Sequence, residues 1–242
     1  MTARLLAIAM VGLLVSVGGP RIGAQAEPEQ STGAQPAKTD DKRLVYADFE
    51  NSTDGKPISS RGGEVRLYAW QENPAIISAF KGHESDNSIP MLVRTSKNDQ
   101  NHAAAFEWEL RVPNQWAGVT MEINGHAGTA GALPADDVSG YKHLNVSVYG
   151  KGTSYVRVEI KSQGREINPH SGYPVTWFKL KDGFNTYQIP LRNFSQPSWV
   201  TDTRIDPKDV LKQLTSIAVS VYCDECRPMS GLLIVDNLVF EK

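Results

Sequence analysis

The chain has 242 residues, with 25 Lys and Arg against 27 Asp and Glu, and a formal net charge of −2 at pH 7. No long run of Lys and Arg occurs, which makes nucleic acid and anionic membrane surfaces poor candidates for a partner. The five histidines lie apart and no nucleophile elbow, His-Glu-x-x-His or phosphate loop is present. The sequence therefore favours a binding protein over an enzyme.

Residues 1–26 have the features of a signal peptide. Arg4 is followed by an apolar stretch from Leu5 to Val17, and Ala24-Gln-Ala26 matches a signal peptidase site. The stretch is shorter than the ~20 residues of a membrane-spanning helix. We therefore expect cleavage before Glu27, a secreted or periplasmic protein, and no stable membrane span after processing. An uncleaved membrane anchor is the alternative.

Residues 27–42 are rich in Gln, Pro, Ala and charge and show no apolar periodicity, which predicts a disordered linker. Residues 43–242 then form one domain. Within it, apolar and polar residues alternate over 117–123, 144–149, 155–161 and 217–222, and Phe106, Trp108 and Leu110 form a further inward row.

Helix is scarce in the domain. Residues 207–214, after Asp206 as a candidate N-cap, predict the single short helix. The fold class is therefore all-β. Short apolar segments at both ends, residues 44–50 and 231–241, each carry carboxylates at their edge. They outline a jelly-roll β-sandwich of two antiparallel sheets whose first and last strands lie together.

Four segments carry a resemblance to known proteins: Asp48-Phe-Glu50, residues 139–144, residues 184–191 and residues 235–240. In order and spacing they resemble the galactose-binding-like jelly rolls, particularly the family 11 carbohydrate-binding modules and the domain of complex I intermediate-associated proteins. The resemblance implies a two-sheet jelly roll without catalysis, a glycan-binding groove on the concave face of one sheet, and a structural calcium near the chain ends.

The carboxylates near the chain ends are the candidate calcium ligands. Ca²⁺ takes six to eight oxygen ligands, and Glu50 and Asp236 converge if the first and last strands are neighbours. Asp48 and Asp54 are further candidates. The alternative is that these acids are ordinary edge or turn residues, with Asp236 capping a bulge.

The two cysteines, Cys223 and Cys226, stand in Cys-Asp-Glu-Cys after a predicted strand. A redox pair needs a helix N-terminus, and a zinc site needs about two more ligands. Export favours oxidation, so a local disulfide across the turn is the preferred interpretation.

Aromatic and charged residues occur together on the polar faces of several strands. Sugar recognition needs this mixture, because a ring stacks on a pyranose while charged groups bind its hydroxyls. Tyr173 and Trp177 line the same groove or pack inside, and Trp199 is a loop aromatic able to close one end. The candidate residues for binding a polysaccharide or oligosaccharide are Tyr149, Tyr155, Arg157, Glu159, Tyr173, Trp177 and Tyr222.

Two other functions remain open. In the first, the chain is a protein-interaction or assembly module of the complex I intermediate-associated type, and a polypeptide occupies the same face. In the second, it is a glycoside hydrolase using Glu107 and Glu109, whose i, i+2 spacing places both carboxylates on one strand face, ~7 Å apart. A solvated strand face explains this pair equally well.

Overall fold

The computed structural model describes residues 42–70, 89–95, 100–123, 134–162, 172–223 and 228–242. The predicted signal peptide and nearly all of the predicted linker lie outside these residues. Residues 37–242 form one compact unit. Its elements, in chain order, are β1 (Arg43–Ala47), β2 (Gly62–Trp70), β3 (Met91–Arg94), β4 (His102–Leu110), β5 (Trp116–Ile123), β6 (His143–Lys151), β7 (Tyr155–Ser162), β8 (Val175–Lys179), β9 (Asn185–Pro190), a 3₁₀ turn (Leu191–Asn193), α1 (Pro207–Lys212), β10 (Leu214–Tyr222) and β11 (Met229–Glu241).

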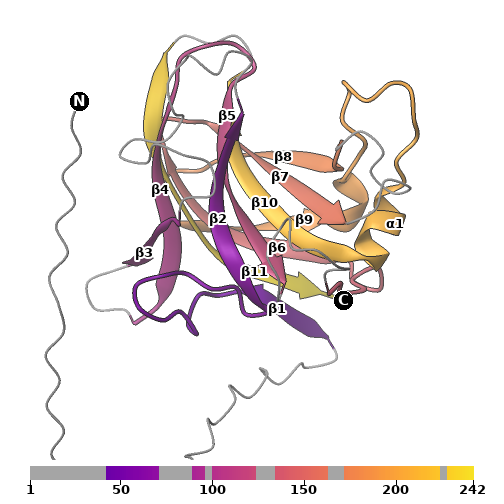
Figure 1. Ribbon diagram of the computed structural model, residues 1–242, viewed down its shortest axis with the longest axis horizontal. Coiled ribbons are helices and arrows are strands. Elements are labelled where there is room, and N and C mark those ends of the chain that lie inside the picture. The colour runs from indigo at the N-terminus through magenta and orange to yellow at the C-terminus, as the bar shows by residue number, and fades with distance from the viewer. Residues whose placement is uncertain (1–41, 71–88, 96–99, 124–133, 163–171, 224–227) are drawn as a thin grey trace, which may run out of the picture. The chain divides into compact units, whose positions relative to one another are not determined.

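The strands form two antiparallel sheets, as Figure 1 shows. One has the order β3-β4-β11-β6-β9, with β1 also paired to β11, and the other has the order β2-β5-β10-β7-β8. Leu44 in β1 lies opposite Phe240 in β11, so the first and last strands are neighbours. The prediction of an all-β jelly-roll sandwich of two antiparallel sheets is confirmed.

The alternation in the sequence decides which side chains fill the core between the sheets. Val156, Val158 and Ile160 of β7 are fully buried, as are their counterparts Ile217, Val219 and Val221 of β10. Phe106, Trp108 and Leu110 are also buried, which confirms the inward row predicted for β4. Since the period of a strand is two, the residues between these apolar positions must project from the opposite face.

The helix α1 begins where the sequence predicts. Asp206 is the N-cap of α1, and its Oδ1 accepts a hydrogen bond of 2.9 Å from the Lys208 backbone N–H. This bond satisfies one of the free N–H groups at the start of the helix. Pro207 occupies the first position, where its missing N–H costs nothing.

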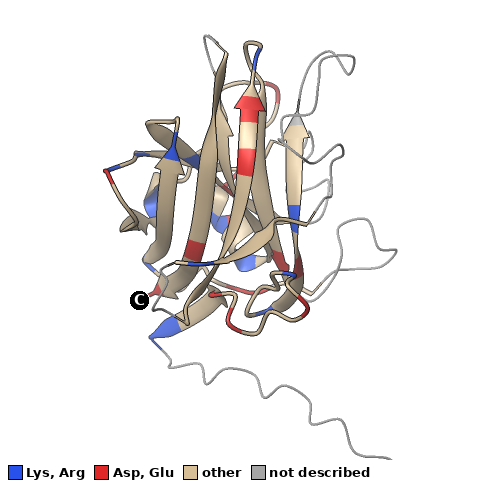
Figure 2. Cartoon of the chain, turned by 90° about the vertical axis from the view of Figure 1, so that its left-hand side faces the viewer, with Lys and Arg blue, Asp and Glu red and all other residues tan. Residues whose placement is uncertain are grey.

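Charge is spread thinly over one face of the molecule (Figure 2). On the face that Figure 2 turns to the viewer, Lys and Arg positions are scattered and do not gather into a patch. Among the described residues, none of the helices has the length and apolar character needed to cross a membrane.

Candidate functional site

The solvent-facing side of the β2-β5-β10-β7-β8 sheet carries a row of side chains that runs straight across all five strands. The strand registers pair Tyr68 with Gly118, Gly118 with Ser220, Ser220 with Arg157 and Arg157 with Trp177. Trp116 and Tyr222 are paired on the same face, two residues farther along β5 and β10. We call this surface, with Tyr155 and the loop residue Trp199, the aromatic face.

Arg157 lies at the centre of the aromatic face and is only 2% exposed. Its Cζ is 5.1 Å from the ring centre of Trp116, 5.5 Å from that of Tyr222, 5.7 Å from Trp177 and 6.0 Å from Trp199. A guanidinium at these distances from an aromatic ring is attracted to the ring electrons. One cation therefore holds together four rings from three strands and a loop.

The charge of Arg157 is balanced within the same face. Its Nη2 lies 2.7 Å from Glu159 Oε1, an ion pair without hydrogen-bond geometry, and its Nε donates a 3.1 Å hydrogen bond to Ser220 Oγ. Glu159, 6% exposed, also lies 3.6 Å from Lys161 Nζ. Burial lowers the pKa of Lys161, and Glu159 partly opposes that shift. A buried charge needs partners of this kind, because water no longer solvates it.

Small residues make room for the rings. A Cβ at Gly118 would lie 2.6 Å from Ser220 Cβ and 2.9 Å from Tyr68 Cε1. The Tyr68 ring therefore lies over Gly118 and packs edge-on against Trp116, with ring centres 4.7 Å apart. Any larger side chain at position 118 would displace it.

Three rings of the aromatic face are accessible to a ligand. Tyr155 is 53% exposed, Trp177 is 43% and Trp199 is 59%. Trp177 packs edge-on against the half-buried Tyr222, with ring centres 5.7 Å apart. Trp177, Trp199 and Tyr222 form an outer layer over the buried Arg157, and Tyr155 extends this layer two residues away on the same face of β7.

The structure brings six of the seven predicted ligand-binding residues together. Tyr155, Trp177 and Tyr222 lie in the outer layer, whereas Arg157 and Glu159 lie below it, on the predicted face of β7 but covered. Tyr173 is near the charged row: its ring centre is 5.1 Å from Lys161 Nζ, and burial and Glu159 raise its pKa. Tyr149 lies in β6, in the other sheet, opposite Ile234.

Sequence reasoning does not select Tyr68, Trp116, Lys161 and Ser220 as members of the site. Lys161 shares the alternation of Tyr155, Arg157 and Glu159, so its face is readable from the sequence. Tyr68 and Trp116 also alternate with core residues in β2 and β5. What the sequence lacks is the order of the strands, which places these residues beside β7.

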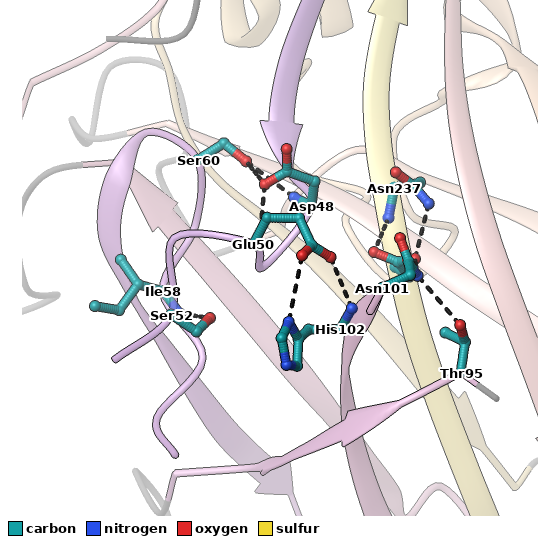
Figure 3. Close-up of polar contacts among 10 residues, drawn as sticks. Asp48, Glu50, Ser52, Ile58, Ser60, Thr95, Asn101, His102 and Asn237 are labelled. Carbon is teal, nitrogen blue, oxygen red and sulfur yellow. Dashed lines mark hydrogen bonds and ion pairs between the residues drawn. The ribbon is translucent and has the colours of Figure 1, made fainter. Parts of the chain in front are cut away.

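The candidate metal ligands lie at the chain-end side of the other sheet, and Figure 3 shows the contacts of Asp48 and Glu50. Glu50 Oε1 accepts a 2.7 Å hydrogen bond from the His102 backbone N–H, and Glu50 Oε2 lies 3.3 Å from His102 Nδ1. Asp48 Oδ1 accepts a 2.6 Å hydrogen bond from Ser60 Oγ. Both carboxylates tie the segment after β1 to its neighbours.

Asp236 is fully buried at a bulge of β11. Its Oδ1 accepts a 2.7 Å bond from the Asn237 backbone N–H, at a residue with φ of 48°, and its Oδ2 accepts one of 2.7 Å from Asn101 Nδ2. Asp236 therefore caps the bulge, the structural role that the sequence left open beside metal binding. Burial raises its pKa to about 6, and the charges of Glu50 and Asp48 add to that rise.

These carboxylates fit a calcium site only in part. Burial is the main cause of the raised pKa of Asp236, and the charges of Glu50 and Asp48 make smaller contributions that a cation would relieve. Within the described segments, however, no group of three or more His, Cys, Asp and Glu side chains is placed to hold a metal ion. Asp54, the fourth candidate, is in a turn with φ of 53°. A calcium here would depend on carbonyl or water oxygens, and it stays a prediction.

Two other pairs predicted from the sequence are the Cys223–Cys226 disulfide and the carboxylates of Glu107 and Glu109. Cys223, directly after Tyr222, is disulfide-bonded, whereas Cys226, its predicted partner, lies outside the described residues. Glu107 and Glu109 lie on β4 of the other sheet, and Glu109 pairs with Arg111 at 2.9 Å.

Solved structures resemble this arrangement of strands. The family 11 carbohydrate-binding module of the cellulosomal cellulase Lic26A-Cel5E of Clostridium thermocellum superposes with a TM-score of 0.51 at 15% identity, over 82% of this chain and 94% of that chain. The chain has the fold of a family 11 carbohydrate-binding module. This confirms the resemblance read from the sequence, at the level of fold.

Two further structures of Clostridium thermocellum modules are similar. A family 11 module in complex with a β-1,3-1,4-mixed-linked tetrasaccharide has a TM-score of 0.49 at 15% identity, over 83% of this chain and 94% of that one. A family 30 module of the cellulosomal cellulase Cel9D-Cel44B has a TM-score of 0.48 at 11% identity, over 73% and 92%. No protein-family model and no curated protein sequence matches the chain.

Proposed function

We propose that the chain is an exported, non-catalytic protein that binds a polysaccharide or oligosaccharide on its aromatic face. The observation that carries this proposal is the group of three exposed rings, Tyr155, Trp177 and Trp199, of which Trp177 and Trp199 lie over one buried arginine. Rings of this kind stack on the C–H face of a sugar, and their fixed positions reduce the entropy lost on binding. The fold shared with a carbohydrate-binding module is consistent with it.

The roles of the residues differ from those expected from the sequence. Tyr155, Trp177 and Trp199 contact the sugar, with Tyr222 at their edge. Arg157 and Glu159 are too deeply buried to be contacts, and they instead fix the positions of the rings from below. Specificity for hydroxyl groups then depends on polar groups at the margin of the rings.

Glycan binding is tested by affinity electrophoresis and calorimetry against a panel of soluble polysaccharides, including mixed-linked and β-1,4-linked glucans. Trp177→Ala and Tyr155→Ala should each weaken binding about tenfold or more, through loss of stacking and buried ring area. Tyr149→Ala is the matched control, because it removes a tyrosine from the other sheet, and binding should not change. If no glycan in the panel binds the parent protein, or if all three variants bind alike, the proposal fails.

The alternative functions have distinct readouts. A protein-interaction module would capture a polypeptide through the same rings and bind no glycan. A hydrolase using Glu107 and Glu109 would release reducing sugar, which Glu107→Gln would abolish, although these residues lie on the sheet opposite the aromatic face. Export has its own test: native protein should begin at Glu27, and an N-terminus at Met1 would contradict it.

A further inference from the structure

A second cleft lies away from the aromatic face, between the start of β6, the end of β9, the 3₁₀ turn and α1. Its volume is about 510 Å³, within the range of pockets that bind small molecules. Its walls include the rings of Tyr141 and Phe194 and the side chains of Leu191 and Leu211. Leu191, Phe194 and Leu211 are only 6%, 3% and 5% exposed and lie behind the wall. The apolar surface open to a ligand comes from the half-buried Tyr141, Pro190 and Pro207.

Basic side chains dominate the polar part of the cleft. Lys142 and His143 come from the start of β6, Arg192 from the 3₁₀ turn and Lys208 from α1. Within the described part of the chain, none of these four side chains forms an ion pair or a side-chain hydrogen bond. Many other basic residues of the domain are paired, for example Arg61 with Asp136 at 2.8 Å and Lys212 with Asp209 at 3.0 Å.

The cleft contains a single carboxylate, that of Asp206. Its Oδ1 is occupied, because it accepts the backbone N–H of Lys208 as the cap of α1. One acid therefore faces three permanent cations and a histidine, in a chain whose overall charge is negative. The local excess of positive charge selects for an anion.

We infer that this cleft binds an acidic sugar, with the carboxylate, sulfate or phosphate group of the sugar held between Lys142, Arg192 and Lys208. Arg192 supplies a planar fork of donors that suits such groups, and the lysines add point charges. The half-buried Tyr141 is the ring that can face the C–H surface of the sugar. The cleft is separate from the aromatic face, so an acidic side group or a second chain can occupy it independently of the glycan proposed above.

The inference is tested on the purified protein by calorimetry with a glucuronate-containing disaccharide, with neutral cellobiose and with sodium sulfate. The uronate should bind, cellobiose should bind at least tenfold more weakly at this site, and raising the salt from 50 to 500 mM should weaken the uronate severalfold. Arg192→Gln and Lys142→Gln should each reduce affinity about tenfold, the worth of one charge-assisted hydrogen bond. Lys181→Gln, an exposed lysine outside the cleft, should have no effect.

Three results would overturn the inference. Equal binding of cellobiose and uronate would show that charge is not recognised. Equal affinity for sulfate and uronate would show a bare anion site with no part for the sugar ring. Uronate binding unchanged in both cleft variants would place the ligand elsewhere. Trp177→Ala separates this cleft from the proposed function, since it should weaken glycan binding to the aromatic face about tenfold or more and leave uronate binding intact.

Discussion

Arg157 combines a permanent charge with almost complete burial, and its surroundings compensate for the lost hydration. Glu159 neutralises it at 2.7 Å, Ser220 accepts a hydrogen bond from it, and four rings surround it at 5.1 to 6.0 Å. The Arg157–Glu159 ion pair therefore differs from a surface ion pair, which contributes ~0–1 kcal/mol to the free energy of unfolding. Removing one partner leaves the other buried without its main counter-charge.

We predict that Arg157→Met lowers the free energy of unfolding by about 3 kcal/mol, because Glu159 keeps only Lys161, 3.6 Å away, as a compensating charge. Urea denaturation followed by circular dichroism measures the change. Adding Glu159→Gln to the Arg157→Met variant should recover part of the loss, since the orphaned charge is then gone. A loss below ~1 kcal/mol for Arg157→Met would mean that the pair does not support the rings.

Asp236 predicts a pH dependence of stability. Its folded pKa of about 6 is above the ~3.9 of an unfolded aspartate, so the folded state binds more protons between these values. Stability therefore falls as the pH rises from ~4 to ~6, by about 3 kcal/mol in total. The charged form costs stability because the carboxylate is buried and close to Asp48 and Glu50.

Asp236→Asn removes the titrating group while keeping its shape. In urea denaturation at pH 4, 5, 6 and 8, the parent protein should lose stability relative to this variant over the lower part of the range. The difference should level off above pH 7. Parallel pH profiles for the two proteins would show that Asp236 has an ordinary pKa.

The segment between the 3₁₀ turn and α1 places Trp199 over Arg157, and one side chain holds that segment in position. Gln196 Nε2 donates to the backbone oxygens of Val200 and Thr203, and Gln196 Oε1 accepts a 2.7 Å bond from the Ile205 N–H. The beginning of the segment is bridged to β8 through Ser195 and Val175. Gln196 thus supplies, from its side chain, hydrogen bonds that a regular element would supply from its backbone.

We expect Gln196→Ala to reduce glycan affinity about as much as Trp199→Ala, because the ring loses its fixed position. The loss of stability should be ~1–3 kcal/mol, from backbone groups left without partners. Calorimetry and denaturation of both variants check this. Full affinity in Gln196→Ala, together with reduced affinity in Trp199→Ala, would show that the segment is held by other contacts.

The strands and their faces follow from local patterns, whereas the assembly of the site does not. The alternation of apolar and polar residues in β7 predicts correctly that Arg157 and Glu159 project from the outer face of the sheet, away from the core. It gives no sign that they are covered, because the covering rings come from β5, β8, β10 and a loop, and Ser220 is 63 residues from Arg157. Tyr149 and Tyr155 are six residues apart and alternate alike, yet the turn between β6 and β7 carries them to different sheets.

At the scale of the whole molecule, the chain-end carboxylates join three parts of the sandwich: the segment after β1, the start of β4 and the bulge of β11. If calcium binds here, it stabilises the native state by an amount that grows with the logarithm of its free concentration above the dissociation constant. We predict a higher melting temperature in 5 mM calcium than in chelator, and no such difference for Asp236→Ala. Identical melting curves for the parent protein in the two buffers would leave bulge capping as the only role of Asp236.

The order of the strands in space also bears on how the chain is made. β10 and β11 are the last strands to be synthesised, and each lies in the middle of its sheet. Until both have left the ribosome, β5 and β7 have no strand between them, and neither do β4 and β6. A nascent or truncated chain that stops before β10 therefore has two halves of each sheet with no strand to join them, and the sandwich cannot fold until β11 has been made. A domain that stays unfolded until its last strand is made would suit passage through a translocation channel, as the proposed export requires.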